Sequence, residues 1–382
     1  MGDTNTQSGN NNDAGRLKLA KWLFSPLAGV TLAPWLHIIK QHGKDIPPRY
    51  WPRTMFTTLM AALNSIVQLR EPTDYLQEEY AVEKPVFIVG HHRSGTTHLW
   101  KLLSVDDQFI YPTVTETIFP STMLTFEKVA ITWAKKLSPR KRPQDNVKSS
   151  SDSPMGEEWA LCASTFLSTH MGRHFPQKRD QFKDYLTLRD LSDEDKKNWK
   201  QALDRFGRKL LYKAGANGGQ TLLFKAPTHT AKIRLLLDLY PDARFIHISR
   251  NPYRVFQSTV NMELKSLPMC AYQKFNLEGL EDYILWRYKT MYQSFFEDLD
   301  AVPDGQITHI HYEDLIQDRV NAVKTIYKEL QLGDFSNIQT KLESYVASIA
   351  DYQKNRYEPL PATKKEAIDT HWGSIIEKLG YK

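Results

Sequence analysis

The chain has 382 residues, of which 41% are hydrophobic and 25% charged, and its formal net charge is +6 at pH 7. This composition is typical of a globular protein that buries a substantial core, organised as one domain with elaborations. The mild basic excess favours anionic ligands, including a doubly phosphorylated nucleotide. No repeat of basic and stacking residues accompanies it, so we predict no nucleic-acid partner.

Cysteine usage indicates the redox setting. Cys162 and Cys270 are the only cysteines, and neither belongs to a C-x-x-C pair. This pattern gives no support for a disulfide framework or a cysteine zinc site. We therefore expect two buried thiols and a reducing, cytoplasmic setting.

The N-terminal region divides into a tail and an arm. Residues 1–14 are polar and slightly acidic, unlike a secretory signal, and we expect a disordered tail. Residues 15–80 are predicted to form a helical arm. Within it, residues 18–40 mix basic and apolar side chains, but Pro26 and Pro34 interrupt any apolar span of about 20 residues, so no transmembrane helix is expected. Two interpretations remain: this segment covers the core, or it lies on a membrane near a lipid substrate.

A second helix is predicted in the arm, over residues 49–70. Its apolar side chains recur at helical spacing, including Trp51, Phe56, Leu59 and Leu63.

The segment that follows the arm, KPVFIVGHHRSGTTHLWKLL at 84–103, has the pattern of a phosphate-binding loop. A buried strand over Val86–Val89 leads into a turn bracketed by Gly90 and Gly95, and a helix follows over Thr96–Leu103. Glycine lets the backbone approach a ligand closely, and N–H groups at a helix start bind anions. We therefore predict an anion site here.

The residues inside this loop differ from those of a nucleoside-triphosphate P-loop. Thr96 and Thr97 follow Gly95 where that motif has Lys and Ser or Thr, and Arg93 is the only arginine or lysine in the loop. The lysine that reaches the β- and γ-phosphates is therefore missing. The loop suits a 5′-phosphate without a triphosphate tail, although an ordinary strand-to-helix turn remains an alternative for this motif taken alone.

A second unit with a similar plan spans residues 222–262. It predicts, in order, a strand, a helix, a strand and a helix over Leu222–Phe224, Thr228–Leu239, Arg244–Ser249 and Pro252–Asn261. Such a run implies parallel strands joined by right-handed crossovers. Arg250 ends the second strand and Ser258 follows eight residues later, so both are expected to face the crevice at the carboxyl end of the sheet.

Together these elements predict an α/β protein with a P-loop-like, three-layer fold: a central parallel sheet flanked by helices, with N-terminal and substrate-side helical elaborations. Residues 81–382 form the main domain. A strand at 307–311 and a helix at 320–330 complete its core. Residues 139–215 form a substrate-side lid or helical insertion, in which a long connection at 138–154 precedes helices at 155–168 and 192–214.

The two phosphate motifs together support a family resemblance. GHHRSGTTHLW, which begins at Gly90, and RNPYRVFQS, which begins at Arg250, resemble the paired signature of sulfotransferases that use 3′-phosphoadenosine 5′-phosphosulfate, in their broad bacterial branch. The resemblance covers roughly residues 84–335. It implies a 5′-phosphosulfate site formed by Arg93, Ser94, Gly95, Thr96 and Thr97, and a 3′-phosphate site formed by Arg250 and Ser258. An Arg fork with a hydroxyl group also suits a phosphate on physical grounds.

The catalytic candidates include two cations and a carboxylate. Arg93 and Lys225 are best placed by sequence to stabilise the departing phosphate, and Lys225 lies in FKAPTHT, which resembles the family's K-x-P-x-H pattern. Glu116 is the first choice as general base, since relatives in the tyrosylprotein branch have a glutamate at a similar distance along the chain after the loop. A helix-cap role is the alternative for Glu116. The reserves are His229 and the Glu157–Glu158 pair; an acceptor-site role is the further possibility for that pair and for Asp145.

Three histidines near the loop, His91, His92 and His98, are interpreted as ligand contacts or packing groups, and no metal is expected. A basic loop at 354–356 is a candidate to close over the nucleotide, by analogy with the superfamily, or is a solvated surface loop.

The predicted function is therefore transfer of a sulfuryl group to a hydroxyl or amine of a small-molecule, lipid or carbohydrate acceptor, with a carboxylate base. Two rivals are a P-loop-type kinase and a non-catalytic nucleotide-binding protein. Peripheral membrane contact through residues 18–40 would accompany a lipid acceptor.

Overall fold

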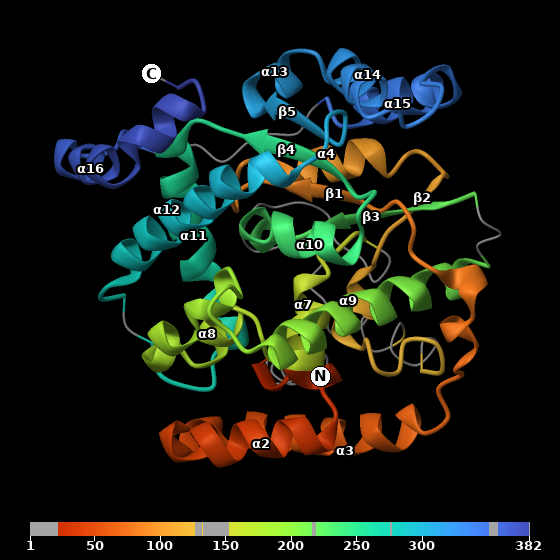
Figure 1. Cartoon of the computed structure of the whole chain (residues 1–382). Coiled ribbons are helices and arrows are strands. Elements are labelled where there is room, and N and C mark those ends of the chain that lie inside the picture. The colour runs from red at the N-terminus through yellow and green to blue at the C-terminus, as the bar shows by residue number, and fades with distance from the viewer. Residues whose placement is uncertain are drawn as a thin grey trace, which may run out of the picture.

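A parallel sheet lies at the centre of the computed structural model, which describes residues 22–126, 132, 153–215, 219–275, 277–350 and 358–381. In this described part five strands have the order β2-β3-β1-β4-β5 (Figure 1). They are β1 (Val86–Val89), β2 (Phe109–Ile110), β3 (Thr221–Lys225), β4 (Arg244–Ser249) and β5 (Ile307–His311). The predicted α/β fold with a parallel sheet is confirmed. The sequence did not predict β2 as a strand, since two residues cannot show an alternating pattern.

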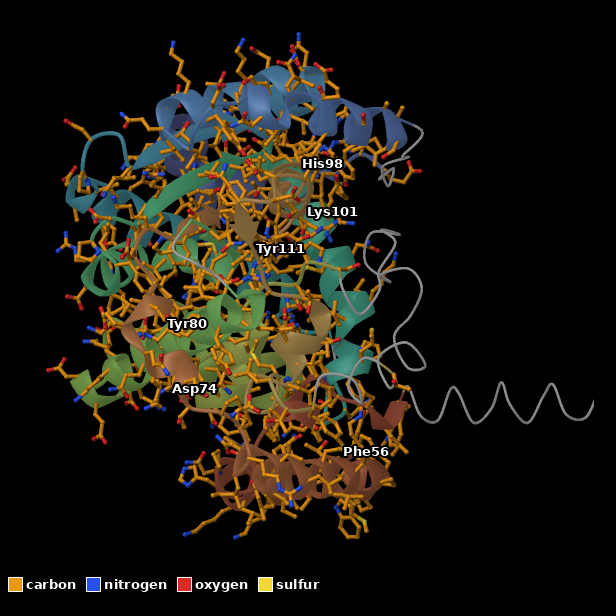
Figure 2. All side chains as sticks on the ribbon, turned by 90° about the vertical axis from the view of Figure 1, so that its right-hand side faces the viewer. Phe56, Asp74, Tyr80, His98, Lys101 and Tyr111 are labelled. Atoms are coloured by element: carbon orange, nitrogen blue, oxygen red, sulfur yellow. The ribbon has the colours of Figure 1, made fainter. Side chains whose placement is uncertain are left out.

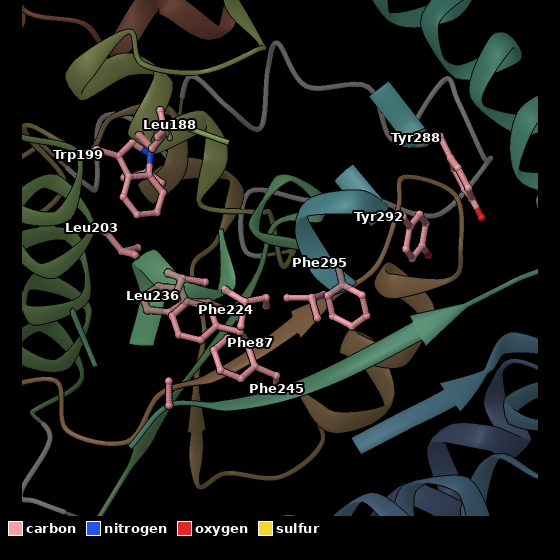
Figure 3. Packing of buried hydrophobic residues seen from close by; sticks show 14 of the residues in the cluster. Phe87, Leu188, Trp199, Leu203, Phe224, Leu236, Phe245, Tyr288, Tyr292 and Phe295 are labelled. Carbon is pink, nitrogen blue, oxygen red and sulfur yellow. The ribbon is translucent and has the colours of Figure 1, made fainter. Parts of the chain in front are cut away.

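Helices cover both faces of the sheet, because successive side chains of each strand point to opposite sides. Phe87, Phe224 and Phe245 lie on one face and pack in one core with helix residues such as Tyr292 and Phe295 (Figure 3). Val86 and Ile88 belong to a second core on the other face. The three layers follow from this division.

The helices of the first face come from several parts of the chain. They are α9 (Asp193–Ala214), α10 (Ile233–Leu239), α11 (Pro252–Cys270), α12 (Leu280–Asp298) and α16 (Ala362–Lys378). The second face is covered by α4 (Thr96–Leu103), α13 (Tyr312–Gln317), α14 (Arg319–Glu329) and α15 (Ser336–Ser348).

The predicted helical arm forms a separate layer at one end of the molecule (Figures 1 and 2). It contains α2 (Leu32–His42) and α3 (Trp51–Gln68). Its own core packs against α7 (Glu158–Thr165) and α8 (Met171–His174), two helices of the predicted substrate-side insertion. The arm therefore contacts the insertion. Within the described residues, each helix is too short or too polar to cross a bilayer.

Two predicted helices have different bounds in the structure. The helix expected over 228–239 is a 3₁₀ turn over Pro227–Ala231 followed by α10, because Lys232 has φ −135° and breaks the helix. Helix α11 continues to Cys270, beyond the expected end at 261. Contacts with other elements outweigh local propensity in both places.

Several predictions lie outside the described residues. These are the tail at 1–14, Asp145, the loop at 354–356, and most of the connection at 138–154.

Candidate active site

The predicted cations lie at the carboxyl ends of three neighbouring strands. Arg93 is in the loop after β1, Lys225 is the last residue of β3, and Arg250 directly follows β4. Because β1 pairs with both β3 and β4, these three positions are adjacent at one edge of the sheet. This edge is where open parallel sheets bind ligands.

The loop after β1 requires glycine at both ends. Gly90 has φ 135°, and a Cβ there would lie 2.2 Å from the carbonyl oxygen of Ile248. Gly95 has φ 106°, and a Cβ there would lie 2.3 Å from the ring of Tyr312. Arg93 also has a left-handed φ of 72°, a conformation that only a few per cent of non-glycine residues adopt. The loop is therefore tightly wound.

The polar groups of this loop divide into two sets. The N–H and hydroxyl groups of Ser94 both donate to the carbonyl oxygen of His91, at 3.1 and 2.8 Å. Ser94 thus shapes the loop, and its predicted contact with a phosphate stays a prediction. Gly95 caps α4, so the N–H groups of Thr96 and Thr97 belong to the first turn, where intrahelical acceptors are lacking. Such a helix start attracts an anion.

The two predicted phosphate sites contact each other directly. Arg93 Nε donates to Ser258 Oγ at 2.9 Å, and Arg250 Nη1 donates to the carbonyl oxygen of Arg93 at 3.2 Å. The Arg250 guanidinium lies 4.3 Å from the ring centroid of Tyr312, the residue after β5. The structure therefore brings Arg93, Arg250 and Ser258 together, although 165 residues separate Arg93 from Ser258.

Lys225 lies between α4, the helix that follows the loop after β1, and the predicted substrate-side insertion. Its Nζ is 5.0 Å from the ring centroid of Trp100 in α4. A Cβ on Gly156 would lie 2.6 Å from the Lys225 carbonyl oxygen and 3.3 Å from Nζ. The ammonium group thus lies among α4, the end of β3 and the segment that leads into α7.

Glu157 and Glu158 fasten the start of α7 to the turn after β3. Glu157 accepts from the Lys225 N–H at 3.0 Å, and its other oxygen lies 2.9 Å from His229 Nε2. Glu158 accepts from Thr228 Oγ1 at 2.5 Å. His229 and Glu157 are both fully buried.

Glu116 has the capping contacts that the alternative interpretation predicted. One carboxylate oxygen accepts from the N–H and hydroxyl groups of Thr113, at 2.7 and 2.8 Å, in a capping box at the start of α5 (Val114–Ile118). The other oxygen forms an ion pair with Lys213. Its role as general base stays a prediction.

The loop histidines are packing groups in this structure. His91 Nδ1 lies 2.8 Å from the His92 carbonyl oxygen, its ring packs 4.9 Å from that of Tyr288, and burial lowers its pKa to about 3. Burial lowers the pKa of His92 well below its ordinary value of 6.5. Both imidazoles are therefore neutral at physiological pH.

A buried ion cluster, defined as Arg173, Glu263 and Arg287, lies beside His92. Glu263 accepts from Arg173 Nε and Nη2 at 3.1 and 3.0 Å, and from Arg287 Nη1 at 2.9 Å. Burial opposes ionisation of Glu263, but the two guanidinium groups outweigh it and hold the Glu263 pKa well below its usual range. The cluster joins α8, α11 and α12.

Sequence reasoning missed two residues that build the site. Thr230 Oγ1 accepts from the Gly90 N–H at 2.7 Å, and Tyr312 supports both Arg250 and the close approach of Gly95. Tyr312 directly follows β5, at the same edge of the sheet as Arg93, Lys225 and Arg250. Its place after a predicted parallel strand is a signal that could have identified it.

Known proteins share both the sequence and the fold. The sulfotransferase family matches residues 85–336. The chain is 30% identical over 370 residues to omega-hydroxy-beta-dihydromenaquinone-9 sulfotransferase Stf3 of Mycobacterium bovis, covering 95% of this chain and 94% of that protein. The Mycobacterium tuberculosis protein of the same name matches equally well.

Two crystal structures show the same fold. Sulfotransferase STF9 from Mycobacterium avium has a TM-score of 0.69 at 15% identity, with 88% of each chain covered. Sulfotransferase STF1 from M. tuberculosis has a TM-score of 0.60 at 15% identity, covering 89% of this chain and 88% of its own. These matches confirm the predicted P-loop-like fold and the family that the two phosphate motifs indicated. The chain belongs to the sulfotransferase family, and it is a sulfotransferase.

Proposed function

We propose that this enzyme transfers a sulfuryl group from 3′-phosphoadenosine 5′-phosphosulfate to a hydroxyl group of a lipid acceptor. The observation that carries the proposal is the direct contact of Arg93 with Ser258 and of Arg250 with Arg93. It joins a loop suited to a 5′-phosphosulfate with an Arg–Ser pair suited to a 3′-phosphate. A donor with a phosphate at each end matches this arrangement.

The groups at this sheet edge divide the tasks of the proposed reaction. The helix start at Gly95–Thr97 binds the 5′-phosphate, while Arg250 and Ser258 bind the 3′-phosphate. Arg93 and Lys225 stabilise negative charge on the departing phosphate. The acceptor oxygen forms a bond to sulfur as the bond between sulfur and the phosphate oxygen breaks, which releases 3′-phosphoadenosine 5′-phosphate.

The acceptor's proton passes to a carboxylate in this scheme, and we propose Glu116 for this role. Glu157 is the reserve, because it contacts the Lys225 backbone directly. We propose that His229 is a positioning residue, since it is fully buried against Glu157.

The proposed acceptor class draws on the relative named for an omega-hydroxylated dihydromenaquinone. Small molecules and carbohydrates are the alternatives. A reducing, cytoplasmic location fits the two buried cysteines, Cys162 and Cys270, neither of which forms a disulfide.

Replacing Arg250 by alanine tests the donor assignment. We expect affinity for 3′-phosphoadenosine 5′-phosphate to fall about 10- to 100-fold, because charge-assisted hydrogen bonds contribute roughly 1.5–3 kcal/mol. Affinity for adenosine 5′-phosphate, which lacks the 3′-phosphate, should change little. Isothermal titration calorimetry measures both ligands.

Arg254→Ala is the matched control, since Arg254 is an exposed arginine in the first turn of α11, four residues after Arg250. Tighter binding of ATP than of 3′-phosphoadenosine 5′-phosphate, or an Arg250→Ala variant with unaltered affinities, would favour the kinase. Nucleotide binding without transfer of labelled sulfate to any lipid or carbohydrate extract would favour the non-catalytic rival.

Replacing Glu116 by glutamine separates its two interpretations. A general base contributes about 10²- to 10⁴-fold, so we expect kcat to fall by such a factor while the melting temperature falls only slightly, because the amide oxygen still accepts the cap hydrogen bonds. The measurement is kcat across pH, with Glu157→Gln beside it. Normal kcat in Glu116→Gln together with a lost kcat in Glu157→Gln would assign the base to Glu157.

A further inference from the structure

Helix α3 turns a continuous apolar face toward solvent. The side chains that form it recur every three or four residues and are between 45% and 86% exposed; they are Trp51, Met55, Leu59, Leu63, Ile66 and Leu69. Spacing of this kind places them on one side of the helix. We call these six residues the α3 apolar face. The helix predicted over residues 49–70 from this apolar spacing is present as α3, over Trp51–Gln68.

The inward side of α3 is fixed by the hydrogen bonds of buried polar side chains. Arg53 is fully buried and donates to the carbonyl oxygens of Trp22, Ala271 and Pro268, at 2.7, 2.5 and 3.3 Å. Farther along the helix, Asn64 donates to two backbone carbonyl oxygens of the arm, at 2.7 and 2.9 Å. These bonds fix the rotation of the helix about its axis, so its apolar side is held outward.

An outward apolar face of this length needs an explanation. Helix α3 has 18 residues, and its only charged side chain is the buried Arg53. A solvated helix face normally carries charges, and large contiguous apolar patches mark sites of contact with proteins or membranes. The face is about 27 Å long at 1.5 Å per residue.

Exposed cations lie at both ends of the face. Lys40, Lys44 and Arg49 lie at the end of α2 and in the connection to α3, and Arg70 follows α3. The one acidic residue of this stretch, Asp45, lies 3.6 Å from Lys178. An apolar stripe with flanking cations matches a bilayer whose headgroups are anionic.

We propose that the α3 apolar face docks on the surface of a membrane that contains anionic lipids, with α3 parallel to the bilayer. Membrane contact was expected through residues 18–40, but in the described part of that segment Leu36 is the only large apolar side chain that is exposed. The docking surface is therefore the outer side of α3. Figure 2 shows that this layer, marked by Phe56, lies at one end of the molecule.

Docking here would bring the bilayer close to Glu116, the residue that we propose takes the acceptor's proton. On the inward side of α3, Met60 packs with Ile118 and Phe119, at the end of the short helix that carries Glu116. The benefit for catalysis depends on the proposed lipid acceptor, whereas docking itself depends only on the α3 face and its flanking cations.

Flotation of the full chain with phospholipid vesicles tests the proposal without donor or acceptor. Vesicles of phosphatidylcholine alone are compared with equimolar phosphatidylcholine and phosphatidylglycerol. We expect the wild type to bind the anionic vesicles. The variant M55Q/L59Q/L63Q should bind them roughly a hundredfold more weakly, because apolar burial drives interfacial binding. Replacing Lys44, Arg49 and Arg70 by glutamine should weaken binding to the anionic vesicles about fivefold per residue and leave binding to phosphatidylcholine vesicles unchanged.

The matched control is L76Q/M269Q/L277Q, which changes three similarly exposed apolar residues outside the α3 face. It should bind vesicles like the wild type. Sedimentation velocity is run on every variant. Equal vesicle binding by all variants overturns the proposal, and a wild-type dimer that M55Q/L59Q/L63Q converts to monomers assigns the face to a second copy of the chain instead. Vesicle binding without sulfuryl transfer would contradict the proposed function and leave the docking surface intact.

Discussion

Replacing Arg93 by methionine is expected to lower kcat for sulfuryl transfer about 10²- to 10³-fold, the usual effect of removing one group that stabilises charge in the transition state. Methionine keeps much of the side chain's length without its charge. Donor affinity should fall less, because Arg250 and the helix start at Gly95 still bind the two phosphates. Single-turnover transfer from labelled donor, measured at saturating donor concentration, separates the two effects.

Arg93→Lys and Arg254→Met are the companion variants. Lysine restores the charge but lacks the planar fork, so we expect partial recovery of the rate. Arg254→Met removes an exposed guanidinium from α11 and should leave the rate unchanged. A variant of Arg93 with weaker donor binding but normal kcat would show that this residue anchors the donor and takes no part in the chemical step.

Replacing Glu263 by glutamine is expected to lower the free energy of unfolding by about 3–5 kcal/mol, because it leaves two buried guanidinium groups without their counter-charge. Both partners are buried, with side-chain exposures of 10% for Arg173 and 4% for Arg287. Chemical denaturation at neutral pH measures the change. The triple variant R173M/E263M/R287M should recover most of the loss, since apolar residues that fit the site replace all three charges.

The pH dependence of stability provides a second readout for Glu263. Its pKa is lower in the folded protein than its ordinary value of 4.5, so its contribution is complete above that pH and is lost as the pH falls below it. Stability of the wild type should therefore decline more steeply below pH 4.5 than that of Glu263→Gln. Equal slopes, with only a small difference at neutral pH, would show that the cluster contributes little.

Local sequence signals predicted three strands of the sheet, and the loop at the carboxyl end of β1, well. The bounds of β1, β4 and β5 agree with the predicted strands, because buried β-branched and aromatic runs between turn residues are a strong signal. The loop bracketed by Gly90 and Gly95 was also predictable, because both positions have a steric requirement that few residues other than glycine meet. The expectation that Arg250 and Ser258 face the same crevice came from helical spacing.

Long-range contacts were not predictable in the same way. The Arg173–Glu263–Arg287 cluster joins residues 90 and 24 positions apart, and single-sequence periodicity does not indicate which buried charges meet. The spacing of apolar residues predicted α3 as a helix but did not indicate which of its sides faces the protein. The deciding contacts are the hydrogen bonds of Arg53 and Asn64 to distant carbonyl oxygens, which no local pattern reveals.

Strand β1 pairs with β3 on one side and with β4 on the other, and this pairing fixes the spacing of the predicted donor site. Adjacent strands lie about 4.8 Å apart through backbone hydrogen bonds, so the backbone sets the spacing of Arg93, Lys225 and Arg250 more than any side chain does. In our proposal the acceptor side is built separately, from α5, α7 and the arm. Exchange of these outer helices would then change the acceptor without altering the spacing of the three cations.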